Sequence, residues 1–281
     1  MIKIFTILIA LKNLVCPCNK MIRGEEFERA GRDYKIKRIS RLAPEVNECS
    51  GLELAEEAGV FYANNDSGGK PELYKIDRNG NLIETISLNG IKNRDWEDLA
   101  KDDSGAIYIG DFGNNSNRRK DLKIYKVYNG KIDSIMFSYP DQTEFPPSSK
   151  KNRNFDMEAF FWYNDSLYLF SKNWGDKKVK FYRLPDRPGS YKADLLGRVT
   201  LKNMITSADI SPDGKQFVLL SYGKVYLFNN VRENGFAFQP YQCKRFARSG
   251  QAEAIVYINN EELLITNEGG KVFLMKKRKA R

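Results

Sequence analysis

The chain has no histidine among its 281 residues. This absence excludes a Ser-His-Asp triad, a Cys-His pair and any zinc site built on imidazole ligands. Any catalysis must therefore use carboxylates, lysine, tyrosine, serine or a cation held by oxygen ligands.

The apolar run near the N-terminus, Ile4–Leu11, is too short to span a bilayer. It follows Lys3 and ends at Lys12, which is the pattern of a secretory signal peptide. We therefore predict an export leader over residues 1–20, followed by a tether or short helix over residues 21–33. The mature protein is expected to be periplasmic or associated with the outer membrane, and an N-terminal strand is the alternative for the apolar run.

Cysteines are scarce, with four in the chain. Cys16 or Cys18 could be the lipid-modified cysteine of a bacterial lipoprotein, although Val15 stands where such a site normally has a small residue. Cys49 and Cys243 fall in nonadjacent repeats of the pattern described below, so a disulfide between them is not favoured.

The formal net charge is +10, which favours solubility or a mild preference for anionic surfaces. The basic end Lys276–Arg281 could contact an acidic partner, but basic chain ends are usually solvated. It has no interleaved aromatic residues, so we predict no nucleic-acid partner. We expect a monomer that touches a membrane only through a lipid at its N-terminus.

A short motif is repeated along the rest of the chain. It is clearest in Asp95–Ala100, followed by Gly110–Asn115. Degenerate copies are Glu48–Leu52, Asp156–Phe160, Thr206–Ile210 and Gln251–Ile255. After each copy come a turn, an apolar strand with a polar end, a tight loop and a third strand. Short strands of this composition between turn signals predict an antiparallel all-β repeat.

The repeat length identifies the architecture. The aligned positions Leu52, Leu99, Phe160, Ile210 and Ile255 are separated by 47, 61, 50 and 45 residues. This period suits one four-stranded β-propeller blade, and the long spacing is explained by an insertion at 140–154. Fourth strands are predicted at 82–88, 132–139, 195–201 and 236–246, and the fifth repeat has none.

We therefore predict an all-β protein in which residues 34–281 form one five-bladed propeller. The strand-like segment Tyr34–Leu42 would supply the missing outer strand beside Val272–Met275 and close the ring.

The motifs also resemble known families. The turn Ser211–Lys215 is similar to that of TolB-like propeller repeats. Asn65–Gly68, Asp95–Ala100, Gly110–Asn115 and Gln251–Ile255 resemble an exported bacterial propeller family related to the SdiA-regulated proteins. TolB-like propellers mostly have six blades, so the resemblance leaves six possible, whereas the repeats give five.

The repeat predicts where polar side chains gather. In such a blade the start of the innermost strand and the end of the second strand lie at the same end of the sheet. Five carboxylates are thus expected around one mouth of the central channel: Glu48, Glu97, Glu158, Asp209 and Glu253. The second-strand ends, including Asn65 and Asn267, would surround them.

So many carboxylates would repel one another unless a cation compensated them, and oxygen ligands favour calcium. The predicted calcium ligands are Glu48, Glu158, Glu253, Asn115 and Asn173. The predicted ligand-binding residues are Asp66, Glu97, Asp111, Asn114, Trp174 and Glu268. Alternatively, the carboxylates accept backbone N–H bonds and tie neighbouring blades together.

Three functions are compatible with this arrangement. The favoured one is a non-catalytic module that binds a small molecule or a protein over the acidic mouth. The second is a calcium-dependent hydrolase resembling lactonase and esterase propellers, with Asp111 or Glu97 as the base. A glycosidase that uses paired carboxylates is a weaker third.

Overall fold

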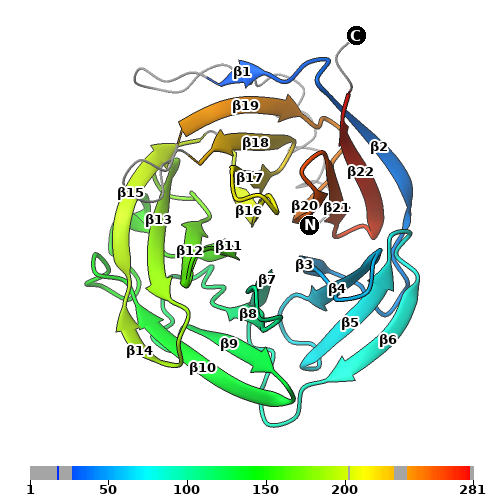
Figure 1. The fold of residues 1–281 in the computed structure, drawn as a ribbon. Helices are drawn as coiled ribbons and strands as arrows, with labels where there is room; N and C mark the ends of the chain where they lie inside the picture. Colours follow the sequence, from blue (N-terminus) through cyan, green and yellow to red (C-terminus); the bar gives the residue numbers. More distant parts are fainter. Residues whose placement is uncertain (1–17, 19–26, 202, 231–238, 279–281) are drawn as a thin grey trace.

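The computed structural model describes residue 18 and residues 27–201, 203–230 and 239–278. Five sheets, mostly antiparallel, are arranged radially around a central channel (Figure 1). The protein is therefore an all-β five-bladed propeller, as the repeat count predicted, and the six-bladed alternative is wrong. Within the described residues, no helix has the length and apolar character needed to cross a membrane.

The blades follow one another along the chain. Blade 1 contains β3 (Cys49–Leu54), β4 (Val60–Asn65), β5 (Glu72–Asp77) and β6 (Leu82–Ser87). Blade 2 contains β7 (Trp96–Lys101), β8 (Ile107–Asp111), β9 (Lys123–Tyr128), β10 (Lys131–Ser138) and the added β14 (Gly189–Lys192). Blade 3 contains β11 (Met157–Trp162), β12 (Ser166–Ser171), β13 (Lys178–Pro185) and β15 (Asp194–Thr200).

The remaining two blades hold both ends of the described chain. Blade 4 contains β16 (Ile205–Ile210), β17 (Gln216–Ser221), β18 (Lys224–Asn229), β19 (Gln239–Arg245) and the two-residue β1 (Glu28–Arg29). Blade 5 contains β20 (Ala252–Asn259), β21 (Glu262–Asn267), β22 (Lys271–Lys277) and β2 (Tyr34–Arg41).

Apolar side chains fill the space between neighbouring blades. Between blades 3 and 4, for example, Phe161 and Phe170 pack against Phe217, which stacks on Phe228 with ring centroids 4.7 Å apart. The innermost strands are almost entirely buried because each has another innermost strand on either side. Burial on both faces accounts for the apolar residues of these segments, while buried polar residues inside them, such as Asp98 and Ser207, form hydrogen bonds.

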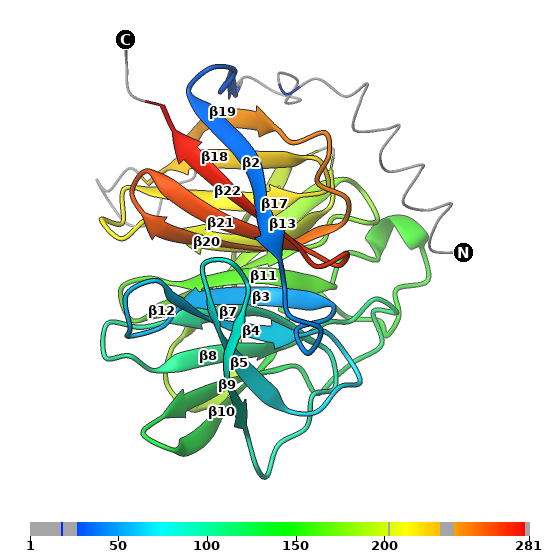
Figure 2. The ribbon, with the colours of Figure 1, turned by 90° about the vertical axis from the view of Figure 1, so that its right-hand side faces the viewer.

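The ring closes as predicted. β2 pairs with β22 in antiparallel register from Tyr34 opposite Lys277 to Arg41 opposite Lys271 (Figure 2). Tyr34 is buried in the cluster between blades 4 and 5. The outer strand of blade 5 therefore comes from the opposite end of the chain.

The segment before β2 is more ordered than a tether. β1 pairs in parallel with β19, and Phe27 packs against Tyr226 and Phe228. The predicted leader and the first part of the predicted tether lie outside the described residues, except Cys18. Its sulfur forms a disulfide with Cys243, while Cys49 is a free, buried thiol.

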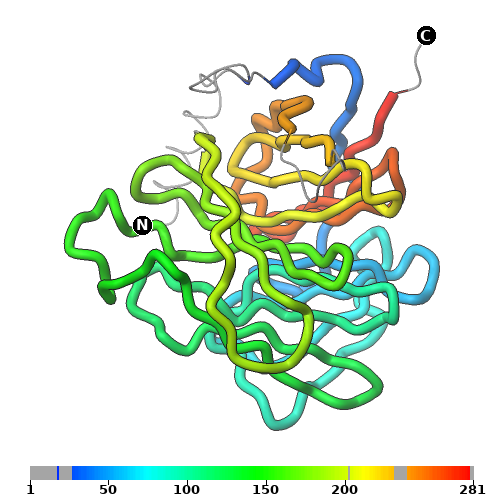
Figure 3. Tube along the Cα trace, turned by 60° about the vertical axis from the view of Figure 1, so that its left-hand side comes forward, coloured from blue at the N-terminus to red at the C-terminus, as the bar shows by residue number. Residues whose placement is uncertain are grey.

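Two insertions modify blades 2 and 3, which Figure 3 brings forward. The predicted one, residues 140–154, contains a single 3₁₀ turn at Lys150–Asn152. The second was not predicted: β14 leaves blade 3 and pairs in parallel with β10 of blade 2. A four-residue strand without strong apolar alternation has little signal in the sequence.

We predict that deleting residues 1–41 lowers the melting temperature strongly or abolishes cooperative unfolding. The deletion removes the buried Tyr34 and leaves β22 as an open sheet edge. A chain that begins at residue 27 is the matched control, because it also lacks Cys18 but keeps β1 and β2. Equal melting temperatures for the two truncated chains would contradict closure by β2.

Candidate functional site

A β-bulge occurs near the start of every innermost strand. In four blades one extra residue lies between the first two paired positions, namely Ser50, Glu158, Thr206 and Glu253, and in blade 2 the bulge covers Glu97 and Asp98. Bulges redirect side chains next to functional sites. Here they place Glu97, Glu158 and Glu253 around the same mouth of the channel.

A cavity of about 230 Å³ lies at this mouth. Eight of the eleven predicted site residues line it: Glu48, Asp66, Glu97, Asn115, Glu158, Trp174, Glu253 and Glu268. Lys172, Tyr222, Gln251 and Ser50 complete the lining. The convergence predicted from the repeat is therefore present for these eight residues.

Asp209 is the exception among the five predicted inner carboxylates. It lines a different cavity, of about 300 Å³, together with Glu53 and Lys101. Ile210 pairs with Phe217 as Leu54 pairs with Phe61, so Ile210 is equivalent to Leu54. The sequence alignment matched Ile210 with Leu52 and was therefore two residues out of register in blade 4. Thr206 occupies the equivalent place, and its hydroxyl donates to the Ala252 carbonyl.

Three further predicted residues have structural contacts instead of facing the cavity. Buried Asp111 forms an ion pair with Arg119, with 2.9 Å between the Asp111 Oδ1 and Arg119 Nη2 atoms. The Asn114 side chain donates to the Phe155 carbonyl and accepts from two backbone N–H groups. The Asn173 amide donates to the Leu201 carbonyl. Asp111 therefore contacts Arg119 and does not line the cavity, so its role as a base stays a prediction.

Asp98 is a carboxylate that ties neighbouring blades together by accepting backbone N–H bonds, which was the alternative to calcium binding. It is fully buried and accepts bonds from the Phe160 and Ala208 backbone N–H groups and from the Ser207 hydroxyl. Its carboxylate thus links blades 2, 3 and 4. Burial raises its pKa well above the usual value, against the opposing effect of these hydrogen bonds.

Lys172 compensates one side of the mouth. This lysine is 7% exposed, and its Nζ lies 2.9 Å from Glu158 Oε2. The Tyr222 hydroxyl donates to Glu253 Oε1 over 2.6 Å. Two of the predicted calcium ligands are thus engaged by neighbours that the sequence analysis did not assign to the site. The sequence contained one signal for Lys172: it directly follows the second strand of its blade, where the other four blades have uncharged or acidic residues.

A second group of carboxylates lies at the blade 1 to blade 2 side of the mouth. One oxygen from each of Asp66, Asp95 and Glu97 lies within 4.8 Å of the others. Burial raises the pKa of all three, that of Asp95 to about 6, and the Asp66 carboxylate adds to the effect on Asp95. Among the described residues, none of the ion pairs involves these three side chains. They can therefore hold a metal ion, and Asp95 was absent from the predicted site.

Gly113 leaves room beside these carboxylates. A Cβ atom at this position would lie 2.5 Å from Asp95 Cγ and still closer to Glu97 Oε1. The glycine therefore keeps open the space between the two side chains.

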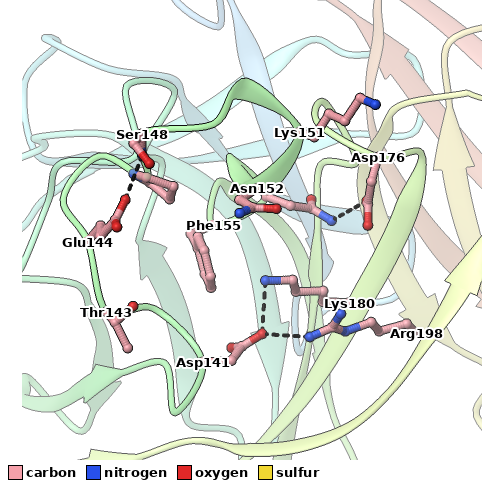
Figure 4. Close-up of a pocket in the computed structure, with 12 residues that line it drawn as sticks. Asp141, Thr143, Glu144, Ser148, Lys151, Asn152, Phe155, Asp176, Lys180 and Arg198 are labelled. Carbon is pink, nitrogen blue, oxygen red and sulfur yellow. Dashed lines mark hydrogen bonds and ion pairs between the residues drawn. The ribbon is translucent and has the colours of Figure 1, made fainter.

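A third cavity, of about 210 Å³, lies under the 140–154 insertion (Figure 4). Asp141 lies at its base and forms ion pairs with Lys180 at 2.9 Å and Arg198 at 3.1 Å. Its principal charges are therefore matched within the protein, and we take the acidic mouth as the candidate site.

No protein-family model and no curated protein matches the chain. Solved propellers are similar in structure. One described as a putative gluconolactonase has 12% identity and a TM-score of 0.52, over 84% of this chain and 76% of its own. The PQQ-bound aldose sugar dehydrogenase from Streptomyces coelicolor has 10% identity and a TM-score of 0.52, over 87% and 98%. At identities this low, the structural similarity shows a shared propeller fold and nothing more. The resemblance to TolB-like and SdiA-regulated proteins therefore stays a prediction.

We predict that Glu253→Gln makes stability less dependent on pH. Burial raises the pKa of Glu253 to about 8, although Lys172 and the Tyr222 hydroxyl lower it. The folded state thus favours the protonated acid, and this contribution is lost as pH rises from about 4.5 through about 8.

Urea unfolding at about pH 5 and about pH 9, in chelator, measures the effect. The loss of unfolding free energy between these values should shrink by more than about 1 kcal/mol in the variant. The exposed Glu261→Gln variant is the control. Equal pH dependence in wild type and Glu253→Gln would contradict a raised pKa.

We also predict that Lys172→Met destabilises the fold by about 3–5 kcal/mol, because it leaves the buried Glu158 carboxylate uncompensated. The double variant Lys172→Met/Glu158→Gln should recover part of the loss. Lys178→Met, at an exposed lysine nearby, is the control for chemical denaturation. A change below about 0.5 kcal/mol for Lys172→Met would show that the ion pair is unimportant.

Proposed function

We propose that this propeller binds a divalent cation at Asp66, Asp95 and Glu97 and uses it to hold a small polar ligand in the adjoining cavity. The observation that carries the proposal is the approach of three carboxylate oxygens within 4.8 Å of one another. Burial, together with neighbouring carboxylates, raises the pKa of all three groups, and a bound cation would stabilise their charged forms.

The identity of the donors supports calcium. All three are carboxylate oxygens, and there is no histidine in the chain. Oxygen ligands on loop and strand ends suit the flexible coordination of calcium better than the strict octahedron of magnesium. Asn115 and Glu48, which line the same cavity, are available as further oxygen ligands.

The remainder of the cavity supports a ligand of limited size. Its volume is about 230 Å³, and its lining is mostly polar, with the half-exposed Trp174 ring at the edge. Glu158 Oε1 is buried and has no hydrogen-bond partner among the residues that the structure describes. A ligand hydroxyl or amine would satisfy this oxygen while another ligand oxygen contacts the cation.

Calcium-dependent hydrolysis is the second candidate. Glu97 belongs to the carboxylate group, and burial raises its pKa well above the usual value, so it is the candidate general acid or base. A cation beside it would polarise a carbonyl oxygen. The description of one similar propeller as a putative gluconolactonase suggests lactones as the first test substrates. Acid release from a lactone that requires both calcium and Glu97 would distinguish hydrolysis from binding alone.

Export is proposed on the N-terminal pattern and on the Cys18–Cys243 disulfide, since disulfides persist in oxidising compartments. The Cys18 sulfur cannot carry both a lipid and this bridge, so in the bridged protein we propose lipidation at Cys16. The two processing sites exclude each other, because cleavage after residue 20 would remove Cys18 and with it the disulfide.

We predict that calcium raises the melting temperature of the wild-type protein. A ligand at about 100 times its dissociation constant stabilises the native state by about 2.7 kcal/mol. Asp95→Asn, which keeps the side-chain shape and removes the charge, should abolish most of this response. The exposed Glu261→Gln should retain it.

Glycine variants give an independent readout of the same site. Gly113→Ala should weaken the calcium response, because its methyl group would push Asp95 and Glu97 apart. Gly69→Ala is the matched control, since the nearest atom to its Cβ would be 3.8 Å away. Identical melting curves for the wild type in calcium and in chelator would exclude the metal site.

A further inference from the structure

The positive charge of the protein is concentrated on one side of the ring. Among the strands of blades 4 and 5, β2 carries four Lys or Arg residues, β22 three, β19 two and β1 one. Their only acidic residue is Glu28. We call the surface formed by these four strands the basic rim. Its excess of nine positive charges is close to the +10 of the whole chain.

Figures 1 and 2 show that the four strands are neighbours at the outer side of blades 4 and 5. Six basic side chains of β2 and β22 are exposed: Lys35, Lys37, Arg38, Arg41, Lys276 and Lys277. The exposed charges of the rim thus lie on two directly paired strands, β2 and β22.

Protection of a sheet edge does not explain this charge. Positive residues on an outer strand can prevent edge-to-edge pairing. However, the outer strand of blade 1, β6, has one acidic and no basic residue, and β15 of blade 3 has one of each. The edges of blades 1 and 3 therefore have no positive excess, and β14 at the edge of blade 2 has only Lys192, so the four charges of β2 need another explanation.

The arrangement within the rim is also unfavourable for the isolated protein. Lys35 lies directly opposite Lys276, whose Nζ forms an ion pair with Glu262 at 2.7 Å, and Lys37 follows on the same face of β2. Glu262 therefore offsets Lys276, whereas Lys35 and Lys37 have no ion pair among the described residues. The Lys37 ammonium lowers the pKa of Lys35, as expected for mutual repulsion. An anionic surface would relieve this repulsion.

We propose that the basic rim docks on an anionic lipid surface. Ile39, in the middle of the charges of β2, is 37% exposed and can contact the acyl boundary. The disulfide fixes Cys18 to β19, so a lipid at Cys16, as proposed above, would be attached two residues before a position that is covalently bonded to the rim. Two residues reach at most roughly 7 Å, so such a lipid and the rim can contact the same membrane.

Flotation of the full chain with lipid vesicles, in chelator, tests this surface separately from the metal site. We expect binding to phosphatidylcholine vesicles that contain phosphatidylglycerol, and its loss at high salt. The variant Lys35→Gln/Lys37→Gln/Lys277→Gln should bind about a hundredfold more weakly, because each charge near an anionic membrane contributes about a factor of five.

The variant Lys131→Gln/Lys178→Gln/Lys192→Gln is the control, since it removes three exposed lysines from blades 2 and 3. Equal weakening of both variants would overturn the proposal, because binding would then depend on net charge alone. Equal binding to pure phosphatidylcholine would overturn it too, since the apolar run alone would then suffice. Rim-dependent binding to duplex DNA without binding to vesicles would assign the rim to a different partner.

Discussion

Closure of the ring is the constraint on which the rest of the structure depends. A blade buries both faces only if it has a neighbour on each side, and the innermost strands approach one another only in a complete circle. The chain meets this constraint by lending β2 to blade 5 and by linking three blades through the Asp98 carboxylate. A closed circle in turn fixes the bulges of the innermost strands at one level, which brings together side chains from distant parts of the sequence.

The mouth of the channel combines two solutions to one electrostatic problem. Around Glu158 and Glu253, the protein supplies its own cation, Lys172, and a hydroxyl donor, Tyr222. Around Asp66, Asp95 and Glu97, no ion pair forms among the described residues, so a bound cation would stabilise the ionised carboxylates. On one side of the mouth a lysine of the protein therefore offsets the carboxylate charge, whereas on the other side no described lysine or arginine forms an ion pair with the carboxylates.

The fold could be predicted from the sequence because each blade repeats the same burial pattern at nearly constant spacing, and because Tyr34–Leu42 was the only unassigned strand. The site could be predicted only in part. The bulges follow from strand pairing that the sequence does not reveal, so blade 4 was aligned two residues late and Asp209 was placed at the wrong mouth. Asp111 and Asn114 have side chains that can bind ligands, but in the structure they contact Arg119 and Phe155. The repeat pattern does not predict these contacts, because Arg119 and Phe155 lie outside the repeated motifs. Lys172 was overlooked because a single lysine at a strand end is usually solvated, and its burial is visible only in three dimensions.

The Cys18–Cys243 bridge has a mechanical consequence. It joins positions 225 residues apart and fastens the N-terminal segment to β19 of blade 4, ahead of the point where the chain enters β2 in blade 5. A pulling force on the N-terminus is therefore carried by a covalent bond into blade 4, and the hydrogen bonds between β2 and β22 are shielded from it. Reduction of the bridge would transfer the same load first to the two-residue β1 and then directly to β2, the strand that closes the ring.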